Sequence, residues 1–439
     1  MEASPERAAE PPPRPRARLP ALLAPFAVRS FRFQFPADLL TSWGVEMETL
    51  ILGWYILAET GSVLLLTLFG ALQYLGTLIA PVFGLAGDRV GHRRVLSGMR
   101  ALFALLAATI AVLALTGILR PLHVLGIAAI AGLVRPSDLA MRNALVAETM
   151  PPDRLMATMG VARTTSDSAR TLGSLAGAGL FVAIGLGHAY LAITMFYALG
   201  FALTLGVGGG RGFAQADAPR AVLRDLREGL EAVWQTPAAL AAMLLAFLVN
   251  LTAFPLTIGL LPYVAREVYG IGQTGLGTLV ASFALGALIG SIAISIMGPR
   301  LRPARMMLVF AFAWYAMLLG FVVMPAPTGG RVMLLLAGMA QSFSMVPMSV
   351  MLLHGAGARF RGRVMGVRML AIYGLPIGLM AAGALIDRIG FVATASGYCI
   401  VGLALTAAIA LRWSAALWPT DAAANLRWMS GSAGSAATR

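Results

Sequence analysis

Long runs of apolar residues dominate the sequence, and each run is about the ~20 residues that a helix needs to cross the hydrocarbon core of a bilayer. Hydrophobic residues make up 59% of the 439 residues and charged residues only 12%, whereas soluble domains are roughly 45 to 50% apolar. The runs are continuous, unlike the ~10-residue alternating segments of a membrane β-barrel. The chain is therefore predicted to be an all-α integral membrane protein.

The apolar runs predict twelve transmembrane helices in two sets of six. The first set is expected at 36–58, 61–83, 95–117, 121–141, 163–185 and 189–207, and the second at 237–262, 273–297, 306–325, 332–354, 366–387 and 391–413. Six helices on each side of a long connection suggest a parallel repeat of one six-helix unit, as in many secondary transporters. The expected domains are an N-terminal tail (1–35), two six-helix halves (36–207 and 237–413), a linker (208–236) and a C-terminal tail (414–439).

Arginine is the only basic side chain in the chain apart from histidine, and it gathers in alternate loops. Several arginines lie in each of the stretches 89–94, 211–227, 300–305 and 359–363, whereas the opposite loops carry them singly. Basic residues accumulate in short cytoplasmic loops, so both tails and the linker are expected in the cytoplasm. Residues 222–234 of the linker have apolar residues at helical spacing and predict an amphipathic helix on the membrane surface.

Several function classes find no support in the sequence. The net charge of +14 is spread over loops without aromatic stacking residues, so it favours contact with membrane lipids over nucleic acid. A chain without lysine has no phosphate-binding Gly-x-x-x-x-Gly-Lys loop. No cofactor, metal site or enzyme activity is therefore expected, because Cys399 is the single cysteine and the histidines are scattered at His92, His123, His188 and His354.

The most charged loop reads GLAGDRVGHRR and lies between the second and third predicted helices. It resembles the loop signature of the major facilitator superfamily, although Ala86 replaces the usual Leu. The matching residues are Gly84, Asp88, Arg89, Gly91, Arg93 and Arg94. The stretches GVEMETLILGW, PSDLAMRNALVAETMPPDRL, DLREGLEAVW and RGRVMGVRML are similar to the branch that contains bacterial macrolide and siderophore (enterobactin-type) exporters.

The resemblance implies a monomeric alternating-access transporter of the bacterial inner membrane, with a small molecule and protons as its partners. In the loop, Gly84 is expected to allow close helix approach and Gly91 a tight turn. Asp88 is expected to pair with arginines or with the positive N-terminal end of a neighbouring helix, which the resemblance identifies as helix eleven. Such a contact would be a latch on the outward-facing state. The alternative is that Arg93 and Arg94 only set topology, which leaves Asp88 unexplained.

The fifth predicted helix contains SARTLGSLAGAG, which resembles the antiporter signature of the family. Gly173 and Gly177 are present, and their Gly-x-x-x-Gly spacing predicts close helix packing. Ser174 replaces a proline of the signature and Ala178 its second glycine. These departures weaken the antiport direction that the signature implies.

Charges inside predicted helices are the strongest functional candidates, because one at the bilayer centre costs about 2.5 to 3.5 kcal/mol even on a lenient scale. Glu46 and Glu48 lie near the middle of the first helix and project about 200° apart. At most one therefore faces a central cavity while the other packs against protein, and the family pattern favours Glu48. Desolvation disfavours the charged carboxylate, so such a group can bind and release a proton near neutral pH.

Other intramembrane charges are spaced for pairing within one helix. Arg135 and Asp138 are three residues apart in the fourth helix, and the fifth helix carries a similar ladder of Arg163, Asp167 and Arg170. Structural ion pairing and transport both explain them. Asp138 is the next candidate for proton coupling after the two glutamates.

The resemblance also implies that helices one, four, seven and ten line the cavity. Arg135 would then face a polar but uncharged wall that includes Asn250, Gln341 and Ser344, with methionines nearby. This lining suits a bulky amphiphile such as a drug, macrolide or siderophore better than an anionic sugar phosphate. We therefore expect proton-driven efflux, and an importer, a lipid flippase or a sensor of the same fold stay open as alternatives.

Overall fold

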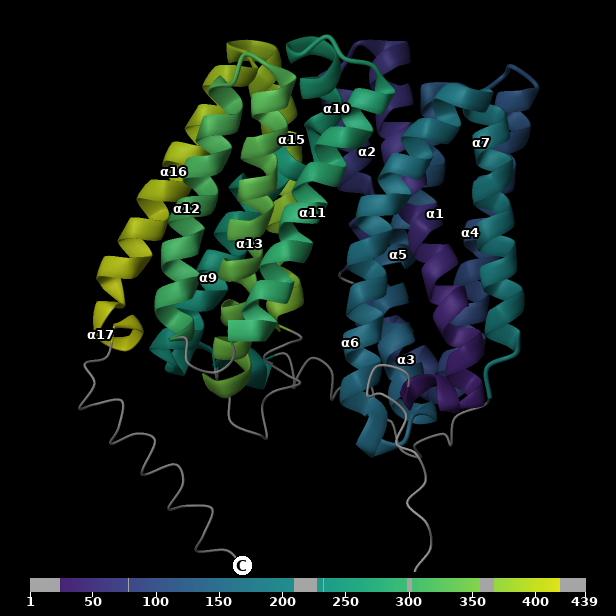
Figure 1. Cartoon of the computed structure of the whole chain (residues 1–439), viewed down its shortest axis with the longest axis horizontal. Helices are drawn as coiled ribbons and strands as arrows, with labels where there is room; N and C mark the ends of the chain where they lie inside the picture. The colour runs from purple at the N-terminus through teal and green to yellow at the C-terminus, as the bar shows by residue number, and fades with distance from the viewer. Residues whose placement is uncertain are drawn as a thin grey trace, which may run out of the picture.

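The computed structural model describes residues 24–77, 79–208, 227–231, 233–297, 302–355 and 367–418. These residues form helices joined by short connections, with no strand among them. The helices group into two bundles that lie side by side, one coloured purple to teal and the other green to yellow (Figure 1). The fold is thus all-α, with an N-terminal half and a C-terminal half, as the two sets of apolar runs predict.

The N-terminal half contains seven α-helices and three short 3-10 or π segments among the described residues. They are η1 (Ala24–Ala27), α1 (Arg29–Thr60), α2 (Val63–Leu72), η2 (Leu75–Thr77), α3 (Ala80–Val90), α4 (His92–Leu115), α5 (Pro121–Thr149), α6 (Pro152–Ser168), η3 (Ala169–Gly173) and α7 (Ser174–Leu205). Segment η3 is a π-helix that continues α6 into α7.

The C-terminal half is built in the same way, and its first span is interrupted by two π-helical segments. Its described elements are α9 (Pro237–Thr252), η4 (Pro255–Gly259), α10 (Leu261–Tyr263), η5 (Val264–Val268), α11 (Gln273–Met297), α12 (Pro303–Val323), α13 (Pro327–Gly355), α15 (Gly374–Ile389), α16 (Phe391–Arg412) and α17 (Ser414–Leu417).

Nine helical segments of the described chain are long and apolar enough to cross a membrane, and the bent pair α2 and α3 makes a tenth. Helix α7 holds the junction of two predicted spans, because Gly185 inside it has a non-helical backbone (φ 76°, ψ 172°). Helix α1 is 32 residues long and is the remaining predicted span. The structure therefore agrees with the twelve-helix prediction.

Some boundaries differ from the hydropathy prediction. Helix α1 begins at Arg29 rather than at residue 36, and α5 runs to Thr149 rather than ending at 141, because helices continue beyond the apolar run into polar surroundings. Of the predicted linker helix, residues 227–231 and 233–235 are helical, and its residues 222–226 lie outside the described part of the chain. The linker and the tails otherwise stay predictions.

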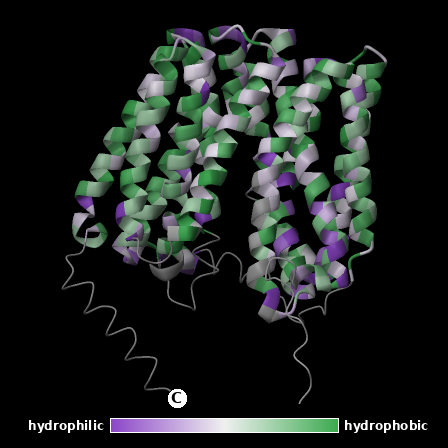
Figure 2. Ribbon diagram, viewed as in Figure 1, coloured by the Kyte–Doolittle hydropathy of each residue, from purple (hydrophilic) through white to green (hydrophobic). Residues whose placement is uncertain are grey.

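The two halves differ in polarity. Hydrophilic residues are concentrated within the lower part of the N-terminal half, whereas the C-terminal half is apolar through most of its height (Figure 2). A charge within the hydrocarbon region is costly unless it is paired or faces water. The side chains that carry chemistry are therefore found mainly in α1, α4, α5 and the α6–α7 segment.

The halves meet through contacts near the upper ends of their helices in Figure 1. Arg266 of η5 donates a hydrogen bond to the carbonyl oxygen of Leu57 in α1. A Cβ at Gly70 of α2 would lie 3.1 Å from a methyl carbon of Leu379 in α15. Helices α7 and α11 also meet closely, because a Cβ at Gly277 would lie 2.6 Å from that of Ala178.

Candidate transport site

Glu48 on α1 is a buried carboxylate whose partners all belong to the N-terminal half. Its Oε2 atom lies 3.0 Å from Nη2 of Arg135 on α5 and accepts a 2.7 Å hydrogen bond from the hydroxyl of Tyr197 on α7. Arg135 also donates to Gln73 Oε1 at 2.5 Å, just after α2, and to Thr49 Oγ1 at 3.3 Å. The Glu48 side chain is only 8% exposed. It is therefore the glutamate that packs against protein.

Glycine on α1 makes room for this arrangement. A Cβ at Gly44 would lie 2.8 Å from a ring carbon of Tyr197, closer than real side chains approach. The glycine thus lets the phenol ring lie against α1, one turn before Glu48. Loss of one partner of such a buried pair leaves the charge of the other uncompensated.

Glu46 lies in different surroundings. Its Oε1 atom is 3.7 Å from Nε of Arg170, in the π-helical η3. The two side chains are 27% and 43% exposed. Of the two glutamates, Glu46 is therefore the one with open space beside it, which reverses the order that the sequence favoured.

The expected ion pair between Arg135 and Asp138 does not form. Arg135 pairs with Glu48, and Asp138 Oδ2 lies 2.5 Å from Nε of Arg142, one turn further along α5. Residues three apart on a helix are neighbours, but a buried charge takes the partner that neighbouring helices bring to it. In the second expected ladder, Arg170 turns to Glu46, and the side chains of Arg163 and Asp167 lie outside the described part of the structure.

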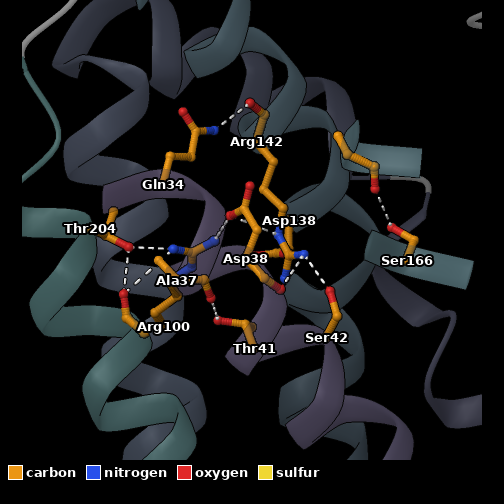
Figure 3. A network of polar contacts seen from close by, with 12 residues as sticks. Gln34, Ala37, Asp38, Thr41, Ser42, Arg100, Asp138, Arg142, Ser166 and Thr204 are labelled. Carbon is orange, nitrogen blue, oxygen red and sulfur yellow. Dashed lines mark hydrogen bonds and ion pairs between the residues drawn. The ribbon is translucent and has the colours of Figure 1, made fainter. Parts of the chain in front are cut away.

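A second charge network, which the sequence analysis missed, lies on the same helices (Figure 3). Arg100 of α4 is fully buried and contacts the carboxylate of Asp38 on α1 and the hydroxyl of Thr204 on α7. Arg142 lies 3.7 Å from the same Asp38 carboxylate and donates to Ser42 Oγ at 2.7 Å. Asp38 and Arg100 lie within the first and third predicted spans, and that placement is the signal that could have identified them.

This network contains two negative and two positive side chains, so its net charge is zero. They are Asp38 and Asp138, and Arg100 and Arg142. A small pocket between α1, α5 and α6 reaches Asp38 and Arg142 and is otherwise lined by residues that include Phe35. Each acid of the network contacts an arginine, and each arginine contacts an acid. The network therefore fits a structural clamp that holds α1, α4 and α5 together.

The charged loop places its histidine between two acids. His92, at the start of α4, has Nδ1 2.5 Å from Oε1 of Glu148 on α5 and Nε2 3.5 Å from Oδ1 of Asp88 on α3. Gly91 has a φ of 100°, as the predicted tight turn requires. Arg93 donates to the carbonyl oxygen of Val207 at 2.9 Å, while Arg89 and Arg94 are exposed.

Among the described residues, a Cβ at Gly84 would meet no atom within 4 Å, so the close helix approach expected there stays a prediction. The close approach occurs at Gly87, where a Cβ would lie 2.7 Å from the His92 ring. The Asp88 side chain is 47% exposed. The expected partner of Asp88, the start of helix eleven before residue 367, lies outside the described residues.

Gly173 and Gly177 bring α1 against η3 and α7. A Cβ at Gly177 would lie 2.9 Å from the Met47 Cα atom, and one at Gly173 would lie 3.3 Å from the Glu46 Cβ atom. Backbone cannot move aside as a flexible side chain can, so a side chain is excluded at position 177, whereas a Cβ at position 173 would require only a small shift of its neighbour. The spacing thus corresponds to close packing, as the sequence predicts.

The candidates in the C-terminal half are mostly turned away from open space. Ser344 is fully buried and donates to the carbonyl oxygen of Met307 on α12, so it does not line a cavity in this structure. Asn250 donates to the carbonyl oxygen of Ala246, one turn earlier on α9, and Gln341 is 9% exposed. Asn250 and Gln341 stay candidates for the cavity wall.

Comparison with known proteins identifies the family. A profile described as Major Facilitator Superfamily matches residues 35–381, whereas no curated protein matched the sequence. Similar solved structures include a bacterial homologue of the human lysosomal transporter Spinster (14% identity, covering 89% of this chain and 98% of that chain, TM-score 0.67). They also include a point mutant of the nucleoside transporter NupG (15% identity, covering 88% of this chain and 99% of that chain, TM-score 0.67). A D-xylose–proton symporter is similar as well (13% identity, covering 86% of this chain and 96% of that chain, TM-score 0.67). The chain therefore belongs to the Major Facilitator Superfamily, whose members are transporters rather than enzymes.

Proposed function

We propose that this transporter exports a small amphiphilic molecule in exchange for protons, by alternating access between its two halves. The observation that carries the proposal is Glu48, a buried carboxylate of a membrane-spanning helix held by Arg135 and Tyr197. The D-xylose–proton symporter, by its name, couples a substrate to protons on the same fold. We place the protein as a monomer in the bacterial inner membrane, with both termini in the cytoplasm and the arginine-rich loops at lipid headgroups.

The coupling step follows from the charge balance of the pair. A proton from the outer side binds the Glu48 carboxylate and removes the negative partner of Arg135. An unpaired guanidinium in a poorly hydrated site is strongly unfavourable, so the protonated form favours a conformation in which Arg135 reaches water or another acceptor. Release of the proton to the inner side restores the ion pair.

Arg135 links this event to the interface between the halves. Its guanidinium also donates to Gln73, which follows directly after α2, and Gly70 of α2 packs against Leu379 of α15. A change in the Glu48–Arg135 pair therefore acts on a segment that contacts the other half. The facing wall contributes uncharged groups such as Asn250 and Gln341, which suit an amphiphile.

The test uses purified protein in proteoliposomes with an imposed proton gradient and the fluorescent drug norfloxacin as substrate. Glu48→Gln mimics the protonated state, so it should abolish concentrative transport while leaving some downhill exchange. Glu59→Gln, at the exposed outer end of the same helix, is the matched control and should transport as wild type. Concentrative transport by Glu48→Gln would move the proton site elsewhere, to Asp138 first.

Glu46→Gln should lower the affinity for norfloxacin but leave the coupling of transport to the proton gradient intact. The same assay separates the alternatives. Accumulation of the drug in the opposite direction would indicate an importer. Movement of labelled lipid would indicate a flippase, and the absence of both drug and lipid flux would indicate a sensor.

A further inference from the structure

Glu46 and Arg170 form an ion pair that is open to a ligand. Nε of Arg170 lies 3.7 Å from Oε1 of Glu46, beyond hydrogen-bond distance. The Glu48–Arg135 pair is different, since its members are 3.0 Å apart and also bonded to Tyr197 and Gln73. The side chains of Glu46 and Arg170 are 27% and 43% exposed, so a carboxylate and a guanidinium at the same place retain unused hydrogen-bonding capacity.

Contacts between the two halves of the molecule lie close to this pair. On one side lies η3, whose continuation α7 meets α11 of the C-terminal half at Ala178 and Gly277. On the other side lies Tyr74, which is within electrostatic range of both Glu46 and Arg170 and next to Leu75, whose carbonyl oxygen accepts a hydrogen bond from Tyr373 of the other half. Two inter-half contacts thus flank the pair. A partly exposed charge within a membrane-spanning helix requires water rather than lipid, so this pair is expected to border the space between the halves.

Local structure holds the two groups in place. Arg170 lies in a π-helical segment, and such interruptions of α-helices are frequent at functional sites. Gly173 lies in the same segment and packs closely against α1. A Cβ at this position would lie 3.3 Å from the Glu46 Cβ atom. The segments of backbone that carry the two charges are therefore packed closely together.

We propose that Glu46 and Arg170 form the binding site for a zwitterionic substrate, with the amine of the substrate at Glu46 and its carboxylate at Arg170. This rests on the proposed export function and narrows its substrate class. A ligand with only an amine would be attracted by Glu46 but repelled by the positive charge of Arg170. A ligand with only a carboxylate would be attracted by Arg170 but repelled by Glu46. A molecule with both groups replaces one loose ion pair by two charge-assisted contacts, which are the stronger kind of hydrogen bond.

The test is equilibrium binding to the full chain in lipid nanodiscs, without a gradient. Three forms of one drug serve as probes: norfloxacin, a zwitterion; its ethyl ester, a cation; and its N-acetyl derivative, an anion. Wild type should bind norfloxacin about tenfold or more tightly than either other form, the range expected for a hydrogen-bonded charge. Glu59→Gln, an exposed charge at the far end of α1, should keep this order.

The two variants of the site should then change in opposite directions. Glu46→Gln should weaken norfloxacin binding about tenfold and strengthen binding of the anionic form. Arg170→Gln should weaken norfloxacin and strengthen the cationic form. A gain for one probe cannot come from misfolding. Equal binding of the three forms by wild type, binding of none, or an equal shift of all three in each variant overturns the proposal.

This outcome is separate from that of the proton-coupling test. Glu48→Gln should keep the preference for norfloxacin even though it cannot concentrate the drug. If Glu48→Gln still concentrates norfloxacin while the zwitterion preference holds, the coupling proposal fails and the binding site stands.

Discussion

Glu46 and Glu48 lie two residues apart on α1 and pair with arginines from different helices, Arg170 in η3 and Arg135 on α5. The Glu46–Arg170 pair is partly exposed and 3.7 Å apart, whereas the Glu48–Arg135 pair is buried, 3.0 Å apart and further hydrogen-bonded to Tyr197 and Gln73. A single helix thus carries one partly exposed carboxylate and one that is buried within its own half. Ligand binding and proton binding can therefore be altered separately, as the experiments above require.

The contact of Gly177 with the backbone of α1 predicts a stability loss on adding a single methyl group. Gly177→Ala places a Cβ about 2.9 Å from Met47 Cα, so it should lower the free energy of unfolding by about 1 to 3 kcal/mol. Gly179→Ala is the matched control, because a Cβ there meets nothing within 4 Å. Thermal unfolding in detergent measures both, and equal melting temperatures for the two variants would contradict the close packing.

The buried Arg100 should be essential for stability through its pairing with Asp38. Arg100→Gln leaves Asp38 with only the 3.7 Å contact to Arg142, so we expect a loss of about 3 to 5 kcal/mol. The exposed Arg94→Gln should have little effect. The double variant Asp38→Asn with Arg100→Gln should recover part of the loss in the same unfolding assay, and a purely additive double variant would show that the two charges are not coupled.

Asp88 should matter for transport more than for folding. Its side chain is half exposed and touches only His92 at 3.5 Å among the described residues, so Asp88→Asn removes little from this conformation. If Asp88 latches the outward-facing state, the variant should be present at wild-type amounts but exchange substrate several-fold more slowly. A wild-type exchange rate at equal amounts of protein would exclude the latch.

The arginine asymmetry predicts that both termini and the 84–96 loop face the cytoplasm. A reporter enzyme fused after Arg439 should be active if it functions only in the cytoplasm and inactive if it needs the periplasm. The opposite pattern would invert the topology, and with it the direction assigned to the proton gradient.

The helical architecture could be predicted because it depends on a one-dimensional property. The length of each apolar run is set by the bilayer thickness, so twelve spans follow from counting. The turn at Gly91 is equally local, since its φ of 100° disfavours any residue with a side chain. Boundaries were less accurate at α1 and α5 because polar residues continue these helices beyond the apolar runs.

The pairing of charges could not be predicted, because it depends on which helices are neighbours. The spacing along α5 favoured a pair of Arg135 with Asp138. In the structure, Arg135 pairs with Glu48 of the neighbouring α1, and Asp138 pairs with Arg142 on the next turn of α5. The rotation of α1 about its axis likewise decided which glutamate is exposed.

Helix α1 has a consequence for how the protein is made. Its length includes Asp38, Glu46 and Glu48, and among the described helices it is not one of those that are apolar enough in composition to cross a membrane. The arginines that neutralise Asp38 and Glu48 come from α4 and α5, which leave the ribosome later. We therefore expect α1 to wait beside the insertion machinery until α5 has been synthesised, so that the first helix of the chain is released into the bilayer as a member of a preassembled group.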